Sequence, residues 1–462
     1  MESIPVEKNK EYIVDIIDNG FEGEGIAKID GYTIFIDGVI KGEKCRILIV
    51  KVTKSHGYGK LIEVIEKSKY RVEADCTTYK RCGGCNLRHI EYNKTLEMKR
   101  DVVQNLVNKI LENKITVRNT IGMEKPYYYR NKAQYPFGIN KNGDKTFGIY
   151  AKRTHEIIDI DDCKIQNPIS KKIATEVLEF VKENNVNVYN EETGKGLLRH
   201  LIVKVGIKTN EVMCVIVLNE EKFEKEQELV KLLIEKFNKD DKNEFKIQTI
   251  VKNINMKNTN VILGQENINL YGNGYIEDIL GEYKFKISPL SFYQVNPVQA
   301  EKLYNLGVSM AEITKNDVVF DLYCGIGTIS LFMSKFAKKV YGIEIVEEAV
   351  KMAKENAQNN NVSNTEFFAG DVEIVLDDLI NNKGLKADVV MFDPPRKGLD
   401  KKSIDNILNI RPKKIVYISC NPATLIRDLA DFENEYDIKT IIPVDMFPFT
   451  SHVECVATLQ LK

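Results

Sequence analysis

The chain has 462 residues, of which 43% are hydrophobic and 29% are charged, and its formal net charge is −1. These values exclude wholesale disorder, and the length predicts about two to four domains. A net charge near zero argues, by itself, against a protein that binds nucleic acid, because such proteins usually carry a basic excess.

The sequence contains no membrane-spanning segment that we can recognise, since its longest apolar run covers only residues 212–218. The N-terminal residues 1–7 lack the basic and apolar pattern of a signal peptide. We therefore expect a cytoplasmic protein without membrane contact. Its nine cysteines are then expected to be thiols, ligands or nucleophiles rather than disulfides.

The first part of the chain predicts a small β-barrel over residues 1–67. Residues 12–16, 32–36 and 45–50 alternate apolar and polar side chains, as strands do. Glycine-rich turns, such as the one around Gly23, separate them. Several short strands at this spacing are typical of a barrel.

The middle of the chain, residues 68–285, predicts a mixed α+β domain with an unusual local charge. Residues 76–155 contain 16 Lys or Arg against 6 Asp or Glu, a local charge of +10, with tyrosines interleaved. This stretch is either a solvated face of a lysine-rich protein or a nucleic-acid-binding surface. The near-zero charge of the whole chain hides it.

The last part, residues 286–462, repeats a pattern of strand, loop and helix, which predicts a doubly wound parallel sheet. Three successive strands end at Asp321, Glu344 and Asp371, and a Gly325-Ile326-Gly327 turn follows the first. Glu344 lies about 20 residues after this turn, where a carboxylate meets ribose hydroxyls. The third glycine of the dinucleotide pattern is missing, so the pattern favours S-adenosylmethionine over NAD.

Two further strand ends carry reactive groups. One ends at Asp393-Pro394-Pro395-Arg396, where Arg396 replaces the aromatic residue of amino-methyltransferases and argues against adenine as the substrate. The next ends at Cys420, which is either a nucleophile or a buried structural thiol. Glu454, near the C-terminus, is either a general base or a solvated acid.

A cysteine and a base beside a methyl donor suit the methylation of uracil at C5. A thiolate that adds to C6 makes C5 nucleophilic enough to attack a sulfonium methyl group, and a base must then remove the C5 proton. Cys420 and Glu454 have the side chains that this chemistry requires.

The sequence resembles the RNA 5-methyluridine methyltransferase family. The resemblance is carried by five motifs in the last third of the chain, at residues 291–296, 321–327, 393–396, 419–422 and 452–454. It implies that Cys420 is the nucleophile and Glu454 the base, and that Phe292 stacks on a base of the RNA. It also implies the residues that hold the methyl donor, which are Gln294, Tyr323, Glu344 and Asp393.

The N-terminal half resembles one branch of that family, the enzymes that act on large-subunit (23S) ribosomal RNA. Residues 5–67 resemble the small RNA-binding TRAM barrel of that branch, which reads charge and shape. The resemblance further implies that residues 93–124 pack on the catalytic domain. No obligate protein partner is implied, and a monomer is expected.

Four cysteines are candidate metal ligands. Cys76, Cys82 and Cys85 lie in one loop with a Gly-Gly turn, and Cys163 is the candidate fourth. Four thiolates suit either structural zinc or an iron–sulfur cluster. The spacing differs from that of radical enzymes, which bind their cluster through C-x3-C-x2-C, and it resembles the loop for a structural [4Fe–4S] cluster in the ribosomal-RNA enzymes.

Two alternatives to a ribosomal-RNA methyltransferase stay open. The same chemistry could act on a tRNA uridine, because archaeal-type tRNA enzymes of this family can carry a similar barrel and cysteine loop. The chain could also be a non-catalytic iron–sulfur protein that binds RNA, although it retains both Cys420 and Glu454.

Overall fold

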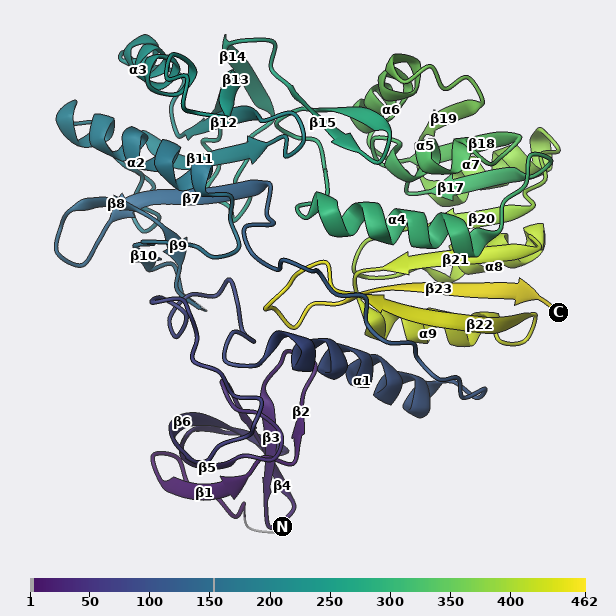
Figure 1. Ribbon diagram of the computed structural model, residues 1–462, viewed down its shortest axis with the longest axis horizontal. Helices are drawn as coiled ribbons and strands as arrows, with labels where there is room; N and C mark the ends of the chain where they lie inside the picture. Colours follow the sequence, from purple (N-terminus) through teal and green to yellow (C-terminus); the bar gives the residue numbers. More distant parts are fainter. Residues whose placement is uncertain (1–3, 153) are drawn as a thin grey trace.

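The computed structural model describes residues 4–152 and 154–462, so residues 1–3 of the expected barrel and Arg153 lie outside the described part. The described chain forms large sheets of six, six and seven strands and two smaller two-stranded sheets. In Figure 1 the N-terminal sheet lies at the bottom, the middle sheet at the upper left and the C-terminal sheet at the right. Within residues 4–152 and 154–462, no helix has both the length and the apolar character that crossing a bilayer requires.

The N-terminal sheet is the expected small barrel, with strand order β1-β5-β6-β4-β3-β2. Its core consists of alternate side chains that point inward, among them the fully buried Ile34, Ile36 and Ile47. Gly59 lets β6 approach this core, because a Cβ there would lie 2.9 Å from Cδ1 of Ile47. The strands are β1 (Glu11–Asp15), β2 (Asp18–Asn19), β3 (Gly25–Ile29), β4 (Tyr32–Ile36), β5 (Lys44–Val52) and β6 (His56–Glu66).

The middle sheet has the order β14-β13-β12-β11-β7-β8, and two helices pack against it. Helix α2 begins at Pro168, whose missing N–H costs nothing at a helix start, and Asn167 caps it. The helices are α2 (Pro168–Glu183) and α3 (Glu226–Asn238), and the strands are β7 (Lys132–Ile139), β8 (Lys145–Phe147), β11 (Leu198–Val205), β12 (Glu211–Leu218), β13 (Lys246–Ile254) and β14 (Glu266–Tyr271). Two small hairpins flank this sheet and are formed by β9 (Ile149–Tyr150) with β10 (Ile157–Ile158) and by β15 (Ile276–Leu280) with β16 (Tyr283–Ile287).

The C-terminal sheet has the order β19-β18-β17-β20-β21-β23-β22, in which the first five strands are parallel and β23 is antiparallel to both neighbours. Its strands are β17 (Val318–Leu322), β18 (Lys339–Glu344), β19 (Thr365–Ala369), β20 (Val389–Phe392), β21 (Lys414–Ser419), β22 (Tyr436–Val444) and β23 (Glu454–Leu461). Its helices are α4 (Pro297–Ala311), α5 (Thr328–Ser334), α6 (Glu347–Asn359), α7 (Val372–Asp377), which continues as a π-helical turn (Asp378–Asn382), α8 (Lys401–Ile410) and α9 (Pro422–Phe432).

Helices cover both faces of this sheet, as a nearly continuous apolar sequence in its strands requires. Val319 and Met391 face one core, which α4, α5 and α6 complete, whereas Phe320 and Phe392 face a second core with α7, α8 and α9. The prediction of a doubly wound sheet that follows a barrel and an α+β region is therefore confirmed.

One helix joins this sheet from a distant part of the sequence. Helix α1 (Tyr92–Ile110) precedes the middle sheet along the chain, yet it packs against α9 and β22. Its buried residues Val103 and Val107 belong to the second core of the C-terminal sheet. In Figure 1, α1 lies between the barrel and that sheet.

Candidate active site

The candidate site residues follow the carboxyl ends of neighbouring parallel strands. Strands β18, β17, β20 and β21 are adjacent and parallel, so their carboxyl ends lie at one edge of the sheet. Glu344 is the last residue of β18, and Tyr323, Asp393 and Cys420 directly follow the other three strands. The sequence therefore places them together through strand order alone.

The turn after β17 is shaped by three residues with positive φ, namely Tyr323 (66°), Gly325 (55°) and Gly327 (81°). Glu344 holds this turn, because its Oε2 accepts the Gly325 N–H at 3.1 Å and its Oε1 accepts the Val346 N–H at 2.9 Å. The Glu344 carboxylate is thus fixed beside the glycine turn, in the place where a ribose-binding carboxylate is expected.

Asp321, near the end of β17, is held inside the fold. Its side chain is buried, and its Oδ2 accepts a hydrogen bond from Ser330 of α5. Burial raises the pKa of Asp321 to about 7. Asp321 therefore ties the first turns of α5 to β17 from within. The side chain of Tyr323 lies near Ser403 of α8.

Cys420 and Glu454 face each other across two antiparallel strands. Ser419 of β21 pairs with Cys455 of β23, so the next residue on each strand, Cys420 and Glu454, meets its partner at the edge of the sheet. The two residues are 34 positions apart in the sequence. This pairing is the geometric basis of the candidate site.

The environment of these two residues keeps the Cys420 thiol and the Glu454 carboxyl group largely protonated at neutral pH. Glu454 is 3% exposed, and in the described part of the chain its Oε2 has no hydrogen-bond partner. Burial, and then the charge of Asp393, raises the pKa of Glu454 to about 8. Burial raises the pKa of Asp393 to about 7. Burial, Glu454 and Asp393 together raise the pKa of the Cys420 thiol to about 11, against an opposing effect of Arg396.

A cation brought among these three groups would lower the pKa of each of them. Such a cation favours the ionised forms of these groups, which include the thiolate and the carboxylate that the reaction requires. The sulfonium of S-adenosylmethionine is a cation of this kind. The site is therefore electrostatically suited to a positively charged methyl donor.

Gln294 and Tyr304 complete the cluster. The Gln294 backbone carbonyl accepts a hydrogen bond from Nδ2 of Asn131 at 3.0 Å, which ties its loop to the start of β7. The Tyr304 side chain of α4 lies near Gln294, and burial raises its pKa, with Asp393 and Glu454 adding to the effect. Tyr304 was not predicted from the sequence, because no motif distinguishes it from other core tyrosines.

Arg396 is a further residue of the site that the sequence did not predict, because its place after Pro-Pro argued only against adenine as the substrate. Its backbone carbonyl accepts hydrogen bonds from Nδ2 of Asn421 at 3.1 Å and from Oγ1 of Thr424 at 3.3 Å. These two hydrogen bonds connect the loop after β20 to the segment that follows Cys420. Phe292, the residue expected to stack on a base, is 72% exposed.

The four candidate ligand cysteines lie around one pocket. Cys76, Cys82, Cys85 and Cys163 all line a cavity of about 260 Å³, together with Arg88 and Arg130. Over residues 4–152 and 154–462, however, no three His, Cys, Asp or Glu side chains converge closely enough to hold a metal ion. The structure thus brings the four thiols to one cavity without showing a metal site.

Comparisons with known proteins agree with this geometry. Residues 91–462 match the family described as tRNA (Uracil-5-)-methyltransferase, and residues 5–62 match the TRAM domain. An uncharacterized RNA methyltransferase of Clostridium acetobutylicum is 46% identical over 99% of this chain and 98% of its own. A second, of Clostridium tetani, is 45% identical over 98% of this chain and 97% of its own.

The crystal structure of Pyrococcus abyssi tRNA (uracil-54, C5)-methyltransferase in complex with S-adenosyl-L-homocysteine is similar as a whole. It shares 26% sequence identity and a TM-score of 0.75, over 97% of this chain and 100% of that one. The chain therefore belongs to the family of S-adenosylmethionine-dependent RNA (uracil-5-)-methyltransferases, with a TRAM domain at its N-terminus.

Proposed function

We propose that the protein transfers the methyl group of S-adenosylmethionine to C5 of specific uridines in 23S ribosomal RNA, through a covalent bond between Cys420 and uracil C6. The observation that carries the chemistry of this proposal is the opposition of Cys420 and Glu454 across β21 and β23, beside the partly buried Asp393. Opposed residues of adjacent strands can present a thiol and a base to adjacent ring carbons, C6 and C5, of one uracil.

The steps balance as follows. Cys420 loses its proton to water, and its sulfur lone pair forms the bond to C6 while the C5–C6 π electrons become an enolate. C5 then forms a bond to the methyl carbon of S-adenosylmethionine as the S–CH3 bond breaks, and the electron pair of that bond leaves with S-adenosylhomocysteine. Glu454 then removes the C5 proton, and the electrons of the C5–H bond restore the double bond as the sulfur leaves C6.

The residues proposed to hold the donor are Gln294, Tyr323, Glu344 and Asp393. The fixed carboxylate of Glu344 beside the glycine turn supports a contact with the ribose. Asp393, on the adjacent parallel strand, lies between this turn and Cys420 and could also orient the uracil. The exposed ring of Phe292 is available to stack on a neighbouring base.

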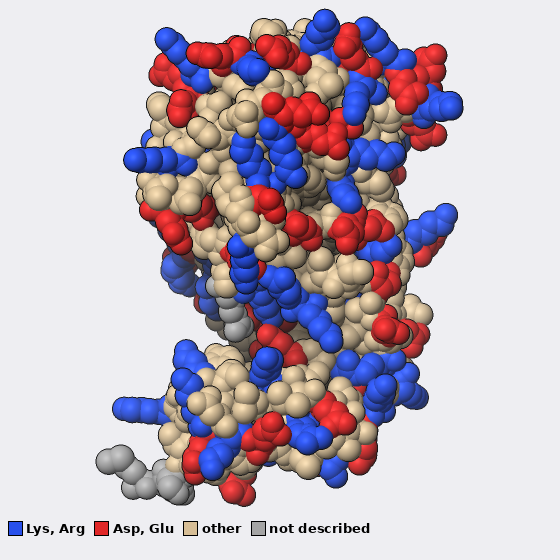
Figure 2. Space-filling view, turned by 90° about the vertical axis from the view of Figure 1, so that its left-hand side faces the viewer, with Lys and Arg blue, Asp and Glu red and all other residues tan. Residues whose placement is uncertain are grey.

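The RNA surface that we propose includes the barrel and the basic stretch at residues 76–155. Figure 2 shows Lys and Arg side chains gathered at the narrowing between the barrel, at the bottom, and the larger body above it. Lys152 in this stretch also pairs with Asp37 of the barrel at 2.7 Å. Positive charge of this kind holds the phosphate backbone and orients the RNA without reading its sequence.

tRNA is the second candidate substrate, because the similar Pyrococcus abyssi enzyme acts on tRNA. Methyl transfer to deproteinised 23S rRNA and to total tRNA, each lacking the modification, separates the two. Incorporation into 23S rRNA alone supports the proposal. Incorporation into tRNA alone contradicts the choice of RNA and leaves the chemistry standing.

We also propose that Cys76, Cys82, Cys85 and Cys163 bind a structural [4Fe–4S] cluster. Four thiols that line one cavity, three of them from one loop, supply the ligand set that a cubane cluster takes. Four thiolates also suit structural zinc, which is the alternative. The cluster would supply no step of the methyl transfer, which needs no electron. Iron and sulfide analysis after anaerobic purification tests this assignment, and an iron-free protein contradicts it.

We further propose a division of the chain into a barrel at 1–67, a central domain at 68–285 and a catalytic domain at 286–462, acting as a monomer.

A further inference from the structure

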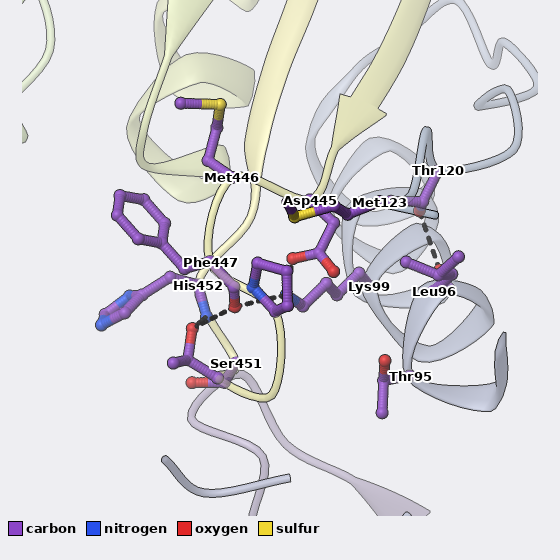
Figure 3. Close-up of polar contacts among 12 residues, drawn as sticks. Thr95, Leu96, Lys99, Thr120, Met123, Asp445, Met446, Phe447, Ser451 and His452 are labelled. Carbon is purple, nitrogen blue, oxygen red and sulfur yellow. Dashed lines mark hydrogen bonds and ion pairs between the residues drawn. The ribbon is translucent and has the colours of Figure 1, made fainter. Parts of the chain in front are cut away.

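The loop that leads to Glu454 is held largely by residues from the N-terminal half of the chain, together with Asn296 and Gln299. We call residues 445–453, between β22 and β23, the base loop, because Glu454 is the next residue. Figure 3 shows this loop beside α1, with Lys99 and Asp445 pointing toward one another. Nζ of Lys99 lies 2.5 Å from Oδ1 of Asp445, and both side chains are buried. The Tyr92 hydroxyl donates to Oδ2 of Asp445 at 2.8 Å.

The other end of the base loop is held by residues 76–88, which carry three of the candidate ligand cysteines and which we call the cysteine loop. The backbone N–H groups of Asn86 and Leu87 donate to the Phe449 carbonyl at 3.1 and 3.0 Å. The Ser451 N–H donates to Oδ1 of Asn86 at 2.8 Å, and Nδ2 of Asn86 donates to the Ser451 hydroxyl at 3.0 Å. Asn86 therefore makes three hydrogen bonds to the base loop, and it directly follows the candidate ligand Cys85.

The base loop has a strained backbone at Phe449, the residue whose carbonyl the cysteine loop contacts. Phe449 has φ of 66°, in the left-handed region that a bulky residue rarely adopts. The guanidinium of Arg88 lies 4.1 Å from the centre of the Phe449 ring, and the ring of Tyr127 lies 5.4 Å from it. A strained backbone conformation persists only where several surrounding contacts hold it in place. Here the surroundings are supplied by the cysteine loop and the segment that follows α1.

The position of the base depends on this loop because the carboxyl group itself is not anchored. Oε2 of Glu454 is buried and has no hydrogen-bond partner among the described residues. Its place is therefore set by its backbone, which β21 and β22 hold on one side and the base loop holds on the other. Ser451, the residue that Asn86 fixes, is three positions before it.

We propose that Asn86 is a positioning residue for proton abstraction, which fixes the base loop through Ser451 and so sets the place of the Glu454 carboxyl group. The cysteine loop thereby has a role in the catalytic step as well as in folding. This inference rests on the proposed function, because it takes Glu454 as the base.

The test separates the two halves of the reaction. Asn86→Ala is given RNA with tritium at uracil C5 and a donor with a carbon-14 methyl group, in single turnover. Displacement of a reacting group by about 1 Å can cost on the order of 100-fold, so we expect tritium release to slow about tenfold or more. Methyl transfer, which precedes the action of Glu454, is expected to change less than about threefold.

Two further variants and a second readout complete the experiment. Asn86→Asp keeps an acceptor for the Ser451 N–H and is expected to restore most of the tritium release. Asn190→Ala also removes two side-chain hydrogen bonds, both accepted by Oδ1, in an exposed turn of the middle region and is the matched control. Amide hydrogen exchange over residues 445–453 is expected to rise in Asn86→Ala and to stay unchanged in Asn190→Ala.

The outcomes are distinguishable. Equal slowing of both steps in Asn86→Ala, or no slowing of either, overturns the proposal and leaves Asn86 a structural residue or a dispensable one. If Asn86→Ala does not fold, unequal slowing must appear in Asn86→Ser, whose shorter side chain cannot make both contacts to Ser451, and its absence there also overturns the proposal. If the unaltered protein transfers methyl groups without releasing tritium, the proposed function fails instead.

Discussion

Replacing Glu454 by Gln tests the electrostatics of the site through the stability of the fold. The carboxyl group of Glu454 has its pKa raised by burial from 4.5 to about 8. A group whose pKa is raised in the folded state favours folding when protonated, so its contribution is lost as the pH rises toward 8. At about 1.4 kcal/mol for each pH unit between the two values, the loss between pH 5 and pH 8.5 is at most about 4 kcal/mol.

Glutamine has the shape of the protonated acid and cannot ionise. We therefore expect Glu454→Gln to match the unaltered protein near pH 5 and to exceed its free energy of unfolding by up to about 4 kcal/mol at pH 8.5. Urea unfolding at a series of pH values measures the difference, and Glu347→Gln, at an exposed position on α6, is the control. A difference that does not grow with pH refutes the reasoning. The same variant is expected to methylate RNA but to stall with the RNA still bound to Cys420.

Two other outcomes follow from the geometry. S-adenosylmethionine binding near pH 7.5 is expected to release protons, because its sulfonium lowers the pKa of Asp393 and Glu454. S-adenosylhomocysteine carries no sulfonium and is expected to release fewer protons. Calorimetry in two buffers of different ionisation enthalpy measures the number of protons released, and equal release by the two ligands contradicts the prediction. Lys99→Met, which leaves Asp445 buried without its cation, is expected to cost about 3–5 kcal/mol of unfolding free energy, and the double variant Lys99→Met/Asp445→Asn to recover most of it. Urea unfolding of the two variants checks this, and a double variant no more stable than the single one counts against a buried ion pair.

Local patterns in the sequence predicted the elements well. The strand at 32–36 has the predicted bounds, and those predicted at 12–16 and 45–50 differ from β1 and β5 by one or two residues, because alternation between turns is a local property. The candidate residues Glu344, Asp393 and Cys420 could be grouped from the sequence because parallel strands end at one edge of a sheet.

Contacts between distant segments could not be read in this way. The opposition of Cys420 and Glu454 depends on the antiparallel register of β21 and β23, and periodicity does not reveal register. The contact of Asn86 with Ser451 joins residues 365 positions apart. The sequence predicted Cys76, Cys82, Cys85 and Cys163 as ligands of one metal group, and the structure places all four around one cavity. The metal that they bind stays a prediction, as do the domain boundaries at 67 and 285.

The central claim is that Cys420 forms a covalent bond to C6 of the target uracil. RNA in which 5-fluorouridine replaces uridine tests it most directly, because fluorine at C5 cannot leave as a cation and the adduct cannot resolve. The unaltered protein with S-adenosylmethionine is expected to give a protein–RNA complex that survives denaturing electrophoresis, and Cys420→Ser is expected to give none. The account is contradicted if the unaltered protein methylates uridine in an RNA whose 5-fluorouridine form gives no such complex, or if Cys420→Ser still forms one.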